Sequence, residues 1–193
     1  MRYKFVEMLV RIAEAKYIRT DKEDRIDEAF ERLMEEVILE NYAWEPWMEF
    51  RREKLWTLEV NDVLSVNMDG LEKLQKHYLT GKKKSMTRKD AIALMTKDTP
   101  VGMNERDTLY CYGMSKMTII DEKNQSKRYN KLELVEFAEF IGRVADLKYK
   151  DSLQLDLGQK IEFVLDDIFL LVDYKRNEKE KFEEECSESD DDY

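Results

Sequence analysis

The chain has 193 residues, of which 42% are hydrophobic and 39% are charged, with six Gly and two Pro. This composition favours a globular, helix-rich protein with a heavily charged exterior. The formal net charge of −10 and the lack of an obvious basic surface argue against a nucleic-acid-binding protein. No apolar run reaches about 18 residues, which excludes a transmembrane span.

The two cysteines have no neighbouring metal-ligand residues and do not indicate a disulfide framework. We therefore expect a reducing compartment and a cytoplasmic location, with no membrane association.

The first predicted helix covers residues 3–17, where Phe5, Met8, Leu9, Ile12 and Ala13 follow helical spacing. A second is expected at about 22–41, with N-cap chemistry in residues 20–23. Residues 5–17 recur as residues 137–149, with Phe, Glu, Arg, Ala, Lys and Tyr at the same six of thirteen places. The helix after each copy is repeated as well. The sequence therefore predicts two copies of one helix–linker–helix unit.

A loop and a helix precede the later copy, but no such partner stands before the first copy. Either the sequence begins inside a longer protein, or the first copy is truncated. In both cases the apolar face of residues 5–13 needs cover from elsewhere. We assign residues 1–41 to a partial EF-hand-like repeat.

Residues 42–56 form an aromatic linker that contains all three tryptophans of the chain. Two interpretations are open: a strip that binds a protein partner, or an internal seam where one helical module packs on the next. The candidate protein-binding residues are Trp44, Trp47, Phe50, Arg51, Arg52 and Trp56.

Further helices are expected at residues 57–78, 104–117, 132–149 and 158–174. Asn67 and Gly70 interrupt the first of these, so two shorter helices can form there. Thr87 with Asp90 predicts a capping box, and Asn104 predicts an N-cap. Residues 57–175 are thus expected to form an EF-hand-like pair plus a C-terminal helix. Residues 176–193 are expected to be an acidic, disordered tail suited to basic partners.

Twice in this region a helix and a polar loop lead through an apolar residue, Met86 or Leu132, into another helix. This is the order of an EF-hand, whose eighth loop residue is apolar and pairs with that of a sister loop. The predicted fold class is all-α: tandem EF-hand-like helix–loop–helix units, with at most a very short two-stranded pairing between the loops.

Neither loop has the oxygen ligands of a calcium site. With Met86 at position eight, the first loop is residues 79–90, and three lysines occupy the place of the ion. With Leu132 at position eight, the second loop is residues 125–136, where only Glu136 matches a ligand position. We expect no metal and no cofactor. A weak alternative is an enlarged loop that uses Asp121, Glu122 and Glu136.

The stretches FVEMLVRIAEAKY, FRREKLWTLEVNDVL, YLTGKKKSMTRKDAIALMTKDTP, ERDTLYCYGMSKMTIIDE, FAEFIGRVADLKY and KIEFVLDDIF cover most of residues 3–173. Together they resemble a family of large EF-hand-like proteins of ciliated protists, associated with cilia and the axonemal cytoskeleton. The resemblance implies protein partners in a ciliary or microtubule-associated assembly.

No catalytic constellation stands out. His77 is expected at a helix end, Cys111 as a buried apolar residue, and no phosphate loop or nucleophile motif occurs. We therefore expect a non-enzymatic scaffold that docks protein partners, with no small-molecule substrate. The alternative is a calcium-responsive EF-hand regulator using a non-standard loop.

Overall fold

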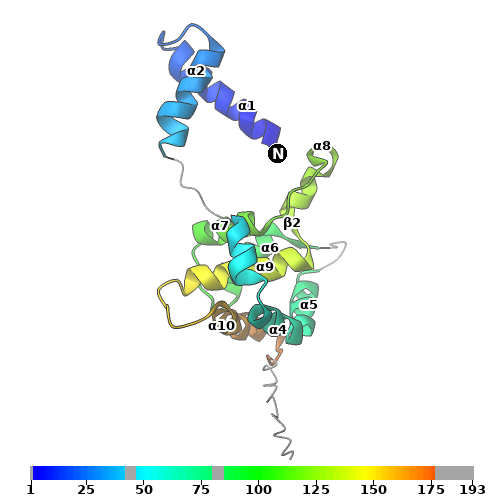
Figure 1. Ribbon diagram of the computed structural model, residues 1–193. Coiled ribbons are helices and arrows are strands. Elements are labelled where there is room, and N and C mark those ends of the chain that lie inside the picture. Colours follow the sequence, from blue (N-terminus) through cyan, green and yellow to red (C-terminus); the bar gives the residue numbers. More distant parts are fainter. Residues whose placement is uncertain (1, 42–46, 80–84, 177–193) are drawn as a thin grey trace, which may run out of the picture. The chain divides into compact units, whose positions relative to one another are not determined.

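The computed structural model describes residues 2–41, 47–79 and 85–176 (Figure 1). These residues are mostly helical, with one short antiparallel pairing of two strands. The predicted all-α class is confirmed. The chain forms two compact units: unit 1 is Met1–Trp47 with Thr118–Tyr129, and unit 2 is Met48–Met117 with Asn130–Tyr193. The predicted tail, except Arg176, and Trp44 lie outside the described residues.

Unit 1 is built on a helical hairpin. Its elements are α1 (Arg2–Ala13), the widened helical turn η1 (Glu14–Ile18), α2 (Ile26–Leu33), the similar turn η2 (Met34–Leu39) and the short helix α8 (Glu122–Gln125). Helices α1 and α2, drawn in blue in Figure 1, pack on each other. The small core between them consists of Leu9, Ala13, Tyr17, Ala29 and Leu33.

The predicted N-cap at residues 20–23 is wrong. The Thr20 hydroxyl donates back to the carbonyl of Lys16 at 2.6 Å, which closes the preceding helix instead of opening the next. Asp21 then takes a left-handed conformation with φ 52°, and α2 begins only at Ile26 with Arg25 as its N-cap. A local hydroxyl bond to the helix behind it therefore outcompeted the forward cap.

The polar loop predicted before Leu132 is largely helical instead, because α8 and a 3-10 turn occupy most of it. The remaining elements lie in unit 2, except where unit 1 is named. They are α3 (Trp47–Glu49, whose first residue is the last of unit 1), η3 (Phe50–Leu55), α4 (Leu58–Val66), α5 (Met68–His77), β1 (Met86–Thr87), α6 (Arg88–Ala93), η4 (Leu94–Asp98), α7 (Glu105–Ser115), η5 (Ser126–Asn130, mostly in unit 1), β2 (Lys131–Leu132), α9 (Leu134–Lys148), α10 (Leu157–Phe169) and η6 (Leu170–Val172). No helix in the described ranges is both long and apolar enough to cross a membrane.

The predicted pairing of the two loops is confirmed. Strands β1 and β2 are antiparallel, and Met86 stands opposite Leu132. Both side chains are buried, so the pairing joins the two helix–loop–helix units through the core as well as through the backbone.

Helix α9 is the central element of unit 2. Each residue from Glu136 to Ala145 is buried, because α7, α10 and α5 all pack on this helix. A helix that is covered on every side needs apolar residues beyond one stripe, and α9 supplies them with Phe137, Phe140, Ile141 and Val144.

The predicted break in residues 57–78 lies at Asn67, which separates α4 from α5, so the two shorter helices are confirmed. The buried Asn67 amide donates to the carbonyl of Val63 at 2.9 Å. Gly70 has a different role, since a Cβ atom there would lie 2.6 Å from the Tyr174 ring and 2.7 Å from the Phe169 ring. It lets α5 approach these two rings.

We predict that Gly70→Ala lowers the free energy of unfolding by about 1–3 kcal/mol, because two stiff rings must move to admit the methyl group. The control is Gly113→Ala in α7, where a Cβ atom would have no neighbour within 4 Å. That variant should gain about 0.5–1 kcal/mol from helix propensity. Urea unfolding of both variants measures the difference. A stabilised Gly70→Ala would contradict the close packing of α5.

Candidate functional site

The second loop holds a positive charge supplied by its own chain. Lys116, at the end of α7, places its ammonium Nζ 2.5 Å from the carbonyl oxygen of Lys131 and 2.5 Å from Oε2 of Glu136. In the loop that has Leu132 at position eight, Lys131 is position seven and Glu136 is position twelve. A calcium loop uses the backbone carbonyl of position seven and the carboxylate of position twelve as ligands. The ammonium thus lies between two groups that hold the ion in a calcium-binding loop.

Glu136 also accepts two backbone hydrogen bonds. The backbone N–H of Met117 donates to Oε1 at 3.0 Å, and that of Glu133 donates to Oε2 at 3.0 Å. The Lys116 and Glu136 side chains are only 8% and 7% exposed. A buried ion pair is tolerated when further hydrogen bonds satisfy both charges, and this carboxylate has them.

In the first loop, the carboxylate at position twelve also serves the backbone. Asp90 accepts from the N–H and from the hydroxyl of Thr87, both at 2.7 Å, and the predicted capping box is present. The three lysines of this loop, residues 82–84, lie outside the described residues. Both position-twelve carboxylates therefore act as helix caps.

The three residues of the weak metal alternative, Asp121, Glu122 and Glu136, belong to different units. Asp121 in unit 1 caps α8 by accepting from the N–H of Asn124, while Glu136 belongs to unit 2. Glu122 accepts from the hydroxyl of Tyr129 at 2.7 Å and from the backbone N–H of Arg2 at 2.8 Å, and these bonds lower the pKa of its carboxyl. No group of three His, Cys, Asp or Glu side chains that could hold a metal ion occurs within the part of the chain that the structure describes.

The aromatic linker is divided between interior and surface. Arg51 pairs with the fully buried Glu139 at 2.8 Å, and the Phe50 ring lies 4.3 Å from the guanidinium of Arg143. Both residues are thus used inside unit 2. Trp56 is 45% exposed and Arg52 is exposed, so an external contact stays a prediction for these two. Trp47 begins α3, but its side chain is outside the description, as is Trp44.

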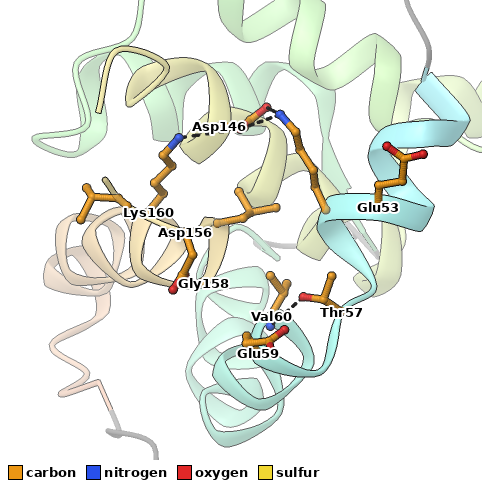
Figure 2. A pocket seen from close by; sticks show the side chains of 11 residues that line it. Glu53, Thr57, Glu59, Val60, Asp146, Asp156, Gly158 and Lys160 are labelled. Atoms are coloured by element: carbon orange, nitrogen blue, oxygen red, sulfur yellow. Dashed lines mark hydrogen bonds and ion pairs between the residues drawn. The ribbon is translucent and has the colours of Figure 1, made fainter. Parts of the chain in front are cut away.

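An open pocket of about 300 Å³ lies between η3, α4 and the start of α10 (Figure 2). Asp146 is bound there by Lys54 at 3.1 Å and faces Lys160 at 3.9 Å. Asp156 caps α10, and the Thr57 hydroxyl accepts from the N–H of Val60. These polar groups already have structural tasks, and we assign no chemistry to the pocket.

His77 and Cys111, the two residues considered for reactivity, lie in positions that suit packing. His77 ends α5 with its ring edge-on to Tyr78 at 5.3 Å. Cys111 is fully buried in α7, as predicted, and burial raises the pKa of its thiol to about 12. A thiol with such a pKa is almost entirely protonated near neutral pH and is a poor nucleophile.

The surface feature that stands out is one side of α1, which we call the docking side and define as Phe5, Met8 and Ile12. These side chains are 55%, 48% and 43% exposed. Their counterparts in the repeat, Phe137, Phe140 and Val144, are each 0% exposed. The sequence indicated that residues 5–13 need cover, but the list of candidate binding residues missed this side, because it was drawn from the tryptophan-rich linker.

Comparison of the chain with protein-family models, curated proteins and solved structures finds no match.

We predict that Lys116→Met lowers the free energy of unfolding by about 3–5 kcal/mol, because it leaves the Glu136 charge buried without its counterion. Adding Glu136→Gln should recover much of that loss. The matched control is Lys54→Met, which breaks the more exposed pair with Asp146 (55% and 27% exposed) and should cost less than about 1 kcal/mol. Denaturant unfolding compares the three. Equal losses for the two single variants would contradict a buried internal cation.

Proposed function

We propose that this protein is a non-enzymatic structural scaffold that docks protein partners through the docking side of α1. The observation that supports this most strongly is the contrast within the repeat. The three docking-side positions are about half exposed in α1, and the equivalent positions are fully buried in α9.

Single exposed apolar residues are common on protein surfaces and need no explanation. Phe5, Met8 and Ile12 differ from this background because they lie on one side of one helix, spaced at i, i+3 and i+7. Grouped apolar surface of this kind marks contact sites, since burying it is worth about 25 cal/mol per Å². The position of these residues therefore favours a binding role.

Unit 2 supports a scaffold role in another way. Its core is continuous around α9, and the charge in its second loop comes from Lys116. A regulator driven by calcium needs a vacant place for the ion and a conformational difference that the ion creates. An ammonium fixed between the position-seven carbonyl and the position-twelve carboxylate disfavours that alternative. We accordingly propose a permanently closed body and constitutive docking.

We propose the ciliary axoneme as the place of action, with partners in a microtubule-associated assembly. This part of the proposal rests on the sequence resemblance to EF-hand-like proteins of ciliated protists. The docking side makes this proposal testable, because a substitution on that side should detach the protein from its assembly.

The test fuses a proximity-labelling enzyme to the full chain in a ciliated protist. We expect the wild-type fusion to label axonemal proteins. Ile12→Asp should abolish that enrichment, because it places a charge on the docking side. The matched control is Ile120→Asp, also in unit 1, at a side chain that is 97% exposed; it should label as the wild type does.

Two results would contradict the proposal. Labelling of cytosolic enzymes with no axonemal enrichment would remove the axonemal role. Axonemal labelling that survives Ile12→Asp would show that the contact is made elsewhere, with Arg52 and Trp56 as the next surface to substitute.

A further inference from the structure

In the second copy of the repeat, the residues equivalent to the docking side are covered by other helices. Helix α7 packs along α9, and the Tyr112 ring meets the Phe140 ring in a T-shaped contact with centroids 6.2 Å apart. Phe140 corresponds to Met8 in the first copy, at the offset of 132 residues that relates the two copies. In the first copy, a helix like α7 would therefore cover Met8.

The buried side of α7 has a simple composition. It presents Thr108, Cys111, Tyr112 and Ser115, all fully buried or nearly so, at i, i+3, i+4 and i+7. Three of these side chains are small and one is aromatic. A helix with this side can lie close against another helix and still insert one large ring between its side chains.

The segment η3 also packs on α9, but its approach cannot be repeated on α1. It comes close where α9 has Gly142, at which a Cβ atom would lie 2.6 Å from Cδ1 of Leu55. The corresponding residue of α1 is Val10, whose branched side chain would occupy that space. A partner that resembles η3 is therefore disfavoured.

The docking side of α1 suits an occupant like α7. Met8 replaces Phe140, and its flexible thioether adapts readily to the edge or face of an aromatic ring. The Glu7–Arg11 pair, at 2.8 Å, reproduces the Glu139–Arg143 pair of α9 at the same distance. This pair does not discriminate between occupants, because in α9 it is buried against Arg51 and Phe50 of η3.

We infer that the docking side of α1 receives one amphipathic helix of a partner protein, with small residues around a single aromatic residue at i, i+3, i+4 and i+7. This inference rests on the proposed function and specifies its partner. A second copy of the chain is the less suitable occupant, because this side of its own α7 is already buried inside unit 2, where α7 packs on α9, α6 and η4.

The probe is a synthetic peptide of residues 104–117, the sequence of α7 itself. A peptide of this length is marginally helical in water, so a hydrocarbon staple joins the exposed positions 106 and 110. Fluorescence anisotropy measures its binding to the full chain under reducing conditions. We expect saturable binding that Ile12→Asp weakens at least about tenfold, or about 1.4 kcal/mol.

Three controls define the result. Ile120→Asp should bind the peptide as the wild type does, and a peptide with Tyr112→Asp should not bind. Met8→Lys is a second variant of the docking side, and circular dichroism verifies that each variant retains its helices. Sedimentation velocity of the chain alone should show a monomer.

Absence of saturable binding, or equal binding by Ile12→Asp, would overturn the inference. A dimer that Ile12→Asp dissociates would also overturn it, because the occupant would then be a second copy. If the peptide fails while axonemal labelling still depends on Ile12, the proposed function stands and only the partner's chemistry is wrong. If the peptide binds but axonemal labelling fails, the inference stands and the proposed location is wrong.

Discussion

The buried ion pair between Lys116 and Glu136 is the constraint on which unit 2 depends. Lys116 stands at the end of α7, Glu136 stands in the first turn of α9, and the Lys131 carbonyl joins them from β2. One ammonium therefore ties together the entering helix, the strand and the exiting helix of the second loop. A calcium ion performs this task in a calcium-binding EF-hand. In this chain the positive charge belongs to the Lys116 side chain, so it does not depend on the concentration of a free ion.

That constraint explains why α9 can be the central helix. Its first turn is anchored to α7, which holds Tyr112 against Phe140 and keeps one side of α9 covered. Helix α10 covers another side, and Arg51 and Arg143 satisfy Glu139, the fully buried carboxylate of α9. In unit 1 the same helical sequence pairs with α2 but keeps its docking side exposed. The two copies thus differ in the elements that pack on them.

Much of the fold followed from patterns in the sequence. The caps at Thr87 and Asn104 rest on spacing within a few residues, and the pairing of Met86 with Leu132 rests on the order of helices and loops. The repeat rests on two similar stretches 132 residues apart. The role of Lys116 could not be found in this way, because it depends on three groups from separate elements. A lysine at the end of a helix usually faces solvent, and nothing in the residues around it signals burial. The predicted N-cap at Thr20 failed for a related reason, since one hydroxyl had two possible partners in the backbone.

The candidate binding residues were also predicted only in part. Aromatic content drew attention to residues 42–56, yet Phe50 and Arg51 are used inside unit 2. The sequence indicated the docking side only through the apolar face of residues 5–13, which was expected to need cover. Comparing the burial of equivalent residues in the two copies gives Phe5, Met8 and Ile12 directly. Aromatic content identifies residues capable of binding, whereas comparison of the two copies identifies the residues that are exposed in one copy and buried in the other.

We expect the second loop to need no ion, because the Lys116 ammonium closes it. Thermal unfolding of the full chain in chelator and in millimolar calcium tests this expectation. An ion present at about 100 times its Kd would add about 2.7 kcal/mol to the stability of a protein that binds it. The internal ammonium predicts the same melting temperature in both solutions. A melting temperature that rises with calcium concentration and saturates would contradict it.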